Sequence, residues 1–306
     1  VGRLPYGLQK RVELGRALAP IPFGSSVYLA TEAILLAGSD TQRKKWLSAL
    51  ANGSAVGTLA FAEAPGFPSQ ASLKTTLAGG KLSGTKIAVP DGNVATFAVV
   101  AARSNAGVSL ALVDLAGPGV TRKATESIDP TRASAQISFK DAPAELLGDE
   151  GRGWELLERV LDRAAVIQAF EQLGGAERAF EITRDFTMGR YAFGRPIASF
   201  QALKHRMADL YVLIELAKSN CYWAAWALSE DNPELAIAAP AARVSATEAF
   251  DTNAVEMVQM HGGVGFTWEY DCHLFYRRAK HQAVALGSPT HWREKLIQRL
   301  IAKQAA

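Results

Sequence analysis

The chain has 306 residues, of which 48% are hydrophobic and 21% are charged. This balance is typical of a globular protein with one large domain or two to three smaller ones. The formal net charge is only +3, and the sequence contains no block of like charge. The charge pattern therefore argues against nucleic acid or an anionic membrane as the main partner, because both need a clustered basic surface.

The order of the residues argues against three further classes. No segment approaches the ~18 uncharged apolar residues of a membrane span. Cys221 and Cys272 lie far apart without zinc-ligand spacing, so neither a disulfide framework nor a metal site is expected. Residues 1–5 lack a signal-peptide pattern, and a cytoplasmic location fits best. Because residues 10–19 already have a helical pattern, we also expect that a segment upstream is missing.

The first part of the chain, residues 1–56, predicts a short helical domain. Ser39 or Asp40 is placed to cap a helix that runs to residue 50. Two helices are expected before it, over residues 10–19 and 27–37.

Residues 57–150 have the pattern of short strands separated by turns. The strand-like runs are 58–61, 72–77, 81–89, 96–101, 108–114 and 135–139. Their spacing predicts an antiparallel barrel or sandwich, and a parallel sheet is not expected because no helix-length insertions separate the runs. No GxGxxG follows a strand, so a Rossmann nucleotide site has no support.

Residues 151–306 return to a helical pattern and predict a bundle of four packed helices. The expected helices cover 153–190, 200–229, 233–261 and 288–303. The fold class expected for the whole chain is therefore α+β, with N-terminal helices, a central β domain and a C-terminal four-helix bundle.

Four local motifs occur in order across this layout. They are Asp-Thr-Gln-Arg-Lys-Lys-Trp-Leu at 40–47, Arg-Tyr-Ala-Phe-Gly-Arg-Pro-Ile at 190–197, Gln-Met-His-Gly-Gly-Val-Gly-Phe-Thr at 259–267, and Tyr-Arg-Arg-Ala-Lys at 276–280. Together with the helix–β–helix order, they resemble the acyl-CoA dehydrogenase family over essentially the whole chain. His261, within the third motif, is more typical of a packed imidazole than of a base.

The resemblance implies FAD as cofactor and an acyl-CoA thioester as substrate. A carboxylate would remove the α-proton while the β-hydride leaves for the flavin. Arg190 would neutralise the FAD pyrophosphate, and Phe193 would lie against its adenosine half. Gln259 and the Gly262–Gly263 turn would let the backbone approach the cofactor. In the family these groups reach the FAD of a neighbouring subunit, which implies an oligomer, and an electron-transferring flavoprotein accepts the electrons.

The β domain departs from the family pattern at both segments that would contact the flavin. Ala62 stands where the family has threonine, and Val89 and Pro90 stand in the second segment. Because Pro90 has neither an N–H nor a hydroxyl, two hydrogen bonds to the flavin are expected to be lost.

The catalytic base is also missing from its usual positions. Leu286 stands where much of the family has glutamate, and Ala164 stands at the alternative position. Asp162 and Glu171 are the remaining candidates, although Asp162 is rotated around the helix and Glu171 lies about 10 Å farther along it. Glu171 and Gln168 predict either a polar acyl pocket or simply exposed helix positions.

Three hypotheses follow. The first is the degenerate subunit of a heteromeric (α2β2) acyl-CoA dehydrogenase of the actinobacterial type that degrades steroid side chains, with the active site completed by the partner. The second is a self-sufficient homo-oligomeric dehydrogenase with a non-standard base. The third is a scaffold that has kept the fold and lost the flavin and the chemistry.

Overall fold

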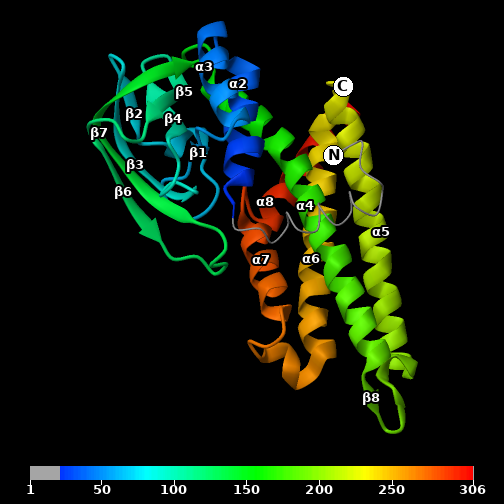
Figure 1. Cartoon of the computed structure of the whole chain (residues 1–306). Coiled ribbons are helices and arrows are strands. Elements are labelled where there is room, and N and C mark those ends of the chain that lie inside the picture. The colour runs from blue at the N-terminus through cyan, green and yellow to red at the C-terminus, as the bar shows by residue number, and fades with distance from the viewer. Residues whose placement is uncertain (1–20, 306) are drawn as a thin grey trace. The chain divides into compact units, whose positions relative to one another are not determined.

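The computed structural model describes residues 21–305. It forms two compact units that meet in sequence at residues 164 and 165 (Figure 1). The helix predicted over residues 10–19 lies outside the described residues. The division into domains at residues 56 and 150 stays a prediction, and each unit is described by itself below.

The first unit opens with three helical segments: η1 (Gly24–Thr31), α2 (Glu32–Ala37) and α3 (Asp40–Ala51). η1 is a π-helix that passes directly into α2. Ser39 caps α3 as predicted, since its hydroxyl accepts from the Gln42 amide at 3.3 Å and Gln42 Oε1 accepts from the Ser39 amide at 3.0 Å. This reciprocal pair is a capping box, which satisfies two backbone donors at the start of the helix.

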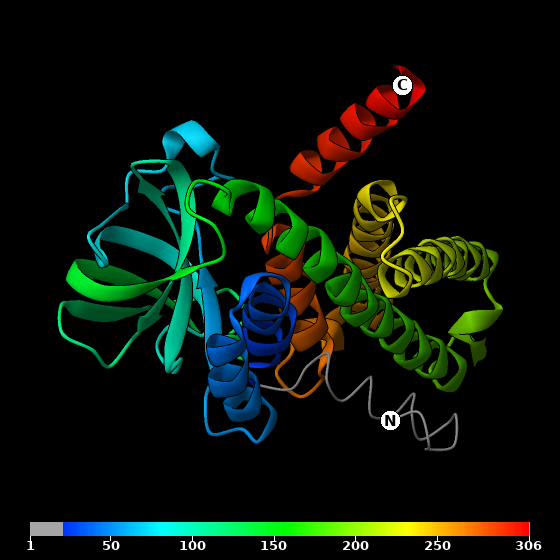
Figure 2. The ribbon, with the colours of Figure 1, turned by 90° about the horizontal axis from the view of Figure 1, so that it is seen from above.

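A sheet follows, and its strands curve around a common core (Figures 1 and 2). The strands are β1 (Gly57–Ala60), β2 (Thr76–Ala78), β3 (Lys81–Pro90), β4 (Phe97–Ser104), β5 (Gly107–Asp114), β6 (Val120–Thr125) and β7 (Ser134–Leu147). The pairings run from β4 through β2, β3, β7 and β5 and return to β4. Sequence analysis gave no strand over β6, whose side chains are mostly exposed.

The expected antiparallel arrangement is wrong for one part of this sheet. β1 pairs with β4 in parallel, with Gly57 opposite Phe97, and β2 touches β4 in parallel at Thr76 and Arg103. The other pairings are antiparallel. The sheet is therefore mixed. Its parallel neighbours need no crossover helix, because the chain passes from one to the other through intervening strands.

The second unit contains most of α4 (Gly153–Gly189), followed by α5 (Gln201–Ser229), α6 (Leu235–His261), α7 (Cys272–Val284) and α8 (Pro289–Ala305). The four expected helices are present as α4, α5, α6 and α8. However, α4 to α7 share one core, so its fourth member is α7, which the sequence pattern did not predict.

Small side chains let these helices approach closely. The shared core is rich in alanine, including Ala169, Ala217 and Ala246. A β-carbon at Gly175 on α4 would lie 2.6 Å from the ring of Phe250 on α6, so this contact requires glycine. Within residues 21–305 no helix has a stretch long and apolar enough to cross a bilayer.

Candidate functional site

A ring stack joins the carboxyl ends of α4 and α6. The imidazole of His261 lies parallel to the ring of Phe186, with centroids 4.1 Å apart, and Tyr270 meets both rings edge-on. Because Arg190 follows Phe186 by four residues and Gly262 follows His261 directly, the stack brings the two predicted cofactor turns to one end of the helical unit.

The turn after α4 presents Arg190 and Phe193. The Arg190 amide donates to Phe186 O at 2.9 Å, and its carbonyl accepts from the Ile197 amide at 2.8 Å. Between them β8 (Tyr191–Ala192) pairs with β9 (Arg195–Pro196). Phe193 at the tip has φ +54° and is 94% exposed. A nearly bare phenyl ring beside an exposed guanidinium is suited to a ligand with an aromatic part and a phosphate.

The turn after α6 presents open backbone. Gly262 has φ +61° and ψ −138°, a conformation that favours glycine. A β-carbon at Gly262 or Gly263 would have no atom of the described residues within 4 Å, so the space directly beside this turn is open in that part of the chain. Gln259 is exposed on the last turn of α6. These residues fit the diphosphate and adenosine parts of FAD.

His261 itself is a packed side chain, as expected. Its Nδ1 lies 2.7 Å from Met257 O, so Nδ1 carries the proton. Burial lowers the pKa of the imidazole, which is therefore neutral near pH 7. The residues that hold the stack, Phe186 and Tyr270, were missed by sequence analysis, because no motif marks them.

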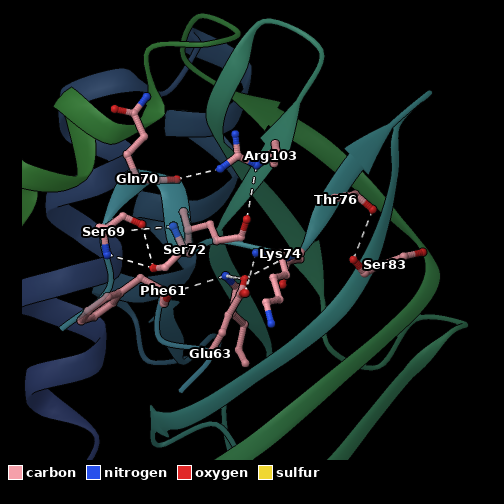
Figure 3. A network of polar contacts seen from close by, with 12 residues as sticks. Phe61, Glu63, Ser69, Gln70, Ser72, Lys74, Thr76, Ser83 and Arg103 are labelled. Carbon is pink, nitrogen blue, oxygen red and sulfur yellow. Dashed lines mark hydrogen bonds and ion pairs between the residues drawn. The ribbon is translucent and has the colours of Figure 1, made fainter. Parts of the chain in front are cut away.

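In the β unit, Glu63 fixes the segment that follows β1 (Figure 3). Its carboxylate accepts from the amides of Lys74 at 2.6 Å and Thr75 at 3.0 Å. It also pairs at 2.6 Å with the ammonium of Lys86 on β3, a fully buried side chain. Despite partial burial, these donors lower the pKa of Glu63 to about 2.

Arg103 on β4 holds the same segment from the other side. Its guanidinium donates to Gln70 O at 2.8 Å and Leu73 O at 3.3 Å. The loop that contains Ala62 is therefore tied to the sheet by two cations, although its sequence departs from the family pattern.

The second predicted flavin segment offers little to a ligand. The side chain of Val89 is buried in the β core, so a cofactor could meet only its backbone. Pro90 O accepts from Thr58 Oγ1 at 2.6 Å. Asp91 accepts from Ser25 Oγ at 2.7 Å, and burial raises the pKa of its carboxyl. The expected loss of hydrogen bonds at Pro90 remains a prediction.

The candidate bases do not lie free on a helix face. Glu171 forms an ion pair at 3.2 Å with Arg278 of α7, and both side chains are buried. Gln168 is buried and donates to Gln282 O at 3.5 Å. The prediction that Gln168 and Glu171 are simply exposed helix positions is therefore wrong. Asp162 is buried as well. Leu286 lies in the loop after α7 with φ +60°.

Comparisons with known proteins find one family of relatives. The family model "Acyl-CoA dehydrogenase, C-terminal domain" matches residues 151–301. Acyl-CoA dehydrogenase IpdE2 of Mycobacterium tuberculosis is 34% identical over 277 residues, which cover 90% of this chain and 72% of that protein.

Two solved structures have the same fold. A variant of the Tcur3481–Tcur3483 steroid ACAD has a TM-score of 0.85 at 28% identity, covering 98% of this chain and 82% of its own. The ChsE4–ChsE5 complex from Mycobacterium tuberculosis has a TM-score of 0.84 at 27% identity, covering 96% of this chain and 80% of its own.

Proposed function

Because this chain belongs to the acyl-CoA dehydrogenase family, we propose that it is one subunit of an FAD-dependent enzyme that desaturates an acyl-CoA thioester between its α and β carbons. A second acyl-CoA dehydrogenase subunit completes the active site in an α2β2 assembly. The enzyme is cytoplasmic, and an electron-transferring flavoprotein accepts its electrons.

The observation that carries the proposal is a contrast between the cofactor turns and the positions of the catalytic base. The turns that present Arg190, Phe193 and Gly262 are open and carry the residue types that a dinucleotide needs. By contrast, Leu286 cannot accept a proton, and Glu171 is committed to Arg278. A chain that keeps the cofactor turns, and whose described part has no free base at Leu286 or Glu171, suits a subunit whose partner supplies the base.

Arg190, Phe193, Gln259, Gly262 and Gly263 would hold the cofactor. Arg190 supplies the fixed cation that a pyrophosphate requires, and the glycine turn lets backbone N–H groups approach it. When bound, FAD accepts the hydride that leaves the β carbon. In a separate contact, the β unit would offer a flavin backbone atoms from the segments around Ala62 and Pro90 rather than side-chain hydrogen bonds.

The substrate class that we propose is a bulky, steroid-derived acyl-CoA. The support comes from the Tcur3481–Tcur3483 steroid ACAD and from the two-component ChsE4–ChsE5 complex, both of which match nearly the full chain.

The test is a visible absorption spectrum with native mass spectrometry on the same sample. The chain is purified alone and together with a second acyl-CoA dehydrogenase chain from the same genome. We expect a colourless protein alone and flavin bands only in the co-purified heterotetramer. In that complex Arg190→Gln should lower the flavin content, whereas Arg184→Gln, at an exposed arginine paired with Asp185, should not.

Two other outcomes would contradict the proposal. A yellow homo-oligomer that oxidises acyl-CoAs by itself would establish a self-sufficient enzyme and would direct attention to Asp162 and Glu171. A protein without flavin in both preparations would favour the non-enzymatic scaffold.

A further inference from the structure

Arg243 of α6 is a buried cation that pairs with no carboxylate among residues 21–305. The residue is 1% exposed, and each hydrogen-bond acceptor of its guanidinium in the described chain is neutral. Burial alone lowers its pKa, to about 9, so the group still carries its charge at neutral pH. Since burying an unpaired charge is costly, such a residue needs a reason to be retained.

The guanidinium joins three helices. Nη1 donates to Gln172 Oε1 on α4 at 2.6 Å and to Thr247 Oγ1 on α6 itself. Nη2 donates to two carbonyls at the end of α7, Gln282 O and, at 2.8 Å, Ala285 O. The guanidinium thus bonds to core side chains through Nη1 and to the end of α7 through Nη2.

These two carbonyls are ones that the helix cannot satisfy. The amide that would bond to Gln282 O in a continued helix belongs to Leu286, which has left the helical path. A cation at the carboxyl end of a helix also interacts favourably with its dipole. Arg243 therefore takes the place of the missing helical turn.

The loop that follows is held in a conformation that few side chains adopt. Leu286 has φ +60° and Gly287 has φ +117°, and the Gly287 amide donates to Val284 O at 3.2 Å. A left-handed leucine persists only where the surroundings determine it. The hydrogen bond from Arg243 to Ala285 O, one residue before Leu286, holds the start of this loop in place.

We propose that Arg243 is a positioning residue, whose guanidinium fixes the 285–287 loop so that residue 286 forms a rigid wall for the acyl group. The acyl part rests on the function proposed above, whereas the holding of the loop does not. Lysine could not replace it fully, because an ammonium has a single nitrogen. It cannot bond to the two carbonyls at the end of α7 while a second nitrogen bonds to Gln172.

The test combines hydrogen–deuterium exchange with steady-state kinetics on the full chain, co-purified with its partner. The kinetic probes are butyryl-CoA, octanoyl-CoA and the CoA thioester of a steroid side-chain acid. In Arg243→Met we expect exchange in peptides covering residues 283–290 to rise at least tenfold, with an intermediate rise in Arg243→Lys. The KM for the preferred thioester should rise about tenfold in Arg243→Met, with little change in kcat.

Two variants guard the interpretation. Arg206→Met removes a partly exposed arginine that pairs with Glu256, and should change neither the loop exchange nor KM. Leu286→Gly removes the side chain of the proposed wall at a backbone conformation that glycine adopts readily, and it leaves the core untouched, so it should raise KM even if Arg243→Met fails to fold.

Unchanged exchange in a folded Arg243→Met would overturn the proposal, and so would faster loop exchange with an unchanged KM. If the wild-type complex oxidises none of the thioesters, the proposed function fails and the acyl part falls with it. The exchange measurement would then still decide whether Arg243 holds the loop.

Discussion

The ring of Phe186 and the imidazole of His261 lie 4.1 Å apart with their planes only 22° from parallel. Each residue stands just before a turn that is proposed to contact the cofactor. The stack therefore fixes the spacing between Arg190 and Gly262, two groups that we propose act on the same ligand. Its neutral imidazole costs no charge burial, which suits a structural partner in this position.

Removing the ring of Phe186 should weaken cofactor binding as well as the stability of the fold. Phe186→Ala is expected to cost about 3 kcal/mol of unfolding free energy and to weaken FAD binding, because both turns lose their common support. Phe180→Ala is the matched control, since Phe180 lies on the same helix and packs against Tyr211. Urea unfolding and flavin titration of the partner complex would show both effects. Equal loss of flavin affinity in the two variants would mean that the stack has no special role.

The Glu63–Lys86 pair predicts a loss of stability in acid. The folded-state pKa of Glu63 is about 2, below the ordinary 4.5, so its contribution is complete above pH 4.5. It declines as the pH falls from 4.5 towards 2, because the unfolded chain then binds the proton more readily. The shift corresponds to a contribution of about 3 kcal/mol at neutral pH.

The measurement is urea unfolding at several pH values between 3 and 7. The difference in unfolding free energy between wild type and Glu63→Gln should be constant above pH 5 and should shrink below pH 4.5. Arg103→Met serves as control, because it releases the same segment without removing the acidic group. A pH-independent difference for Glu63→Gln would contradict the assignment.

The elements that sequence analysis missed lack an uninterrupted apolar pattern. α7 buries Cys272, Phe275 and Ala279, but the same face also buries Arg278 and Gln282, so its periodicity is obscured by polar residues. The parallel pairing of β1 with β4 was missed for another reason. Strand partners depend on the path of the whole chain, and no local spacing records that path.

The candidate site could be predicted only where function leaves a local motif. Arg190, Phe193 and the Gly262–Gly263 turn could be named as candidates because such motifs mark them. Arg243 was not, because its role depends on Gln282 and Ala285, about forty residues later in the chain. One signal was available: Arg243 is the first charge in an alanine-rich stretch of helix from residue 235, a place where an exposed arginine is unexpected.

Glu171→Gln should act mainly on stability. Glu171 neutralises Arg278, which is fully buried, and removing one partner of a buried pair typically costs 3–5 kcal/mol. The double variant Glu171→Gln with Arg278→Met should recover much of this loss, because no buried charge is then left unpaired. Thermal unfolding of both variants checks the expectation. If Glu171→Gln instead kept its stability and flavin but lost all turnover, Glu171 would be the base and the shared-site proposal would be wrong.

Leu286→Glu should give this chain a base of its own. The loop is already fixed by Arg243 and by its own turn, so the new carboxylate would project from a backbone held in place. In the flavin-loaded complex, with the partner's base removed, we expect reduction of the flavin by acyl-CoA to quicken by about 100-fold or more, the usual effect of a general base. Leu286→Gln, which has the same shape without a basic oxygen, should remain at the starting rate. Stopped-flow absorbance of the flavin band distinguishes them, and equal rates in the two variants would mean that position 286 does not face the reacting carbon in this subunit.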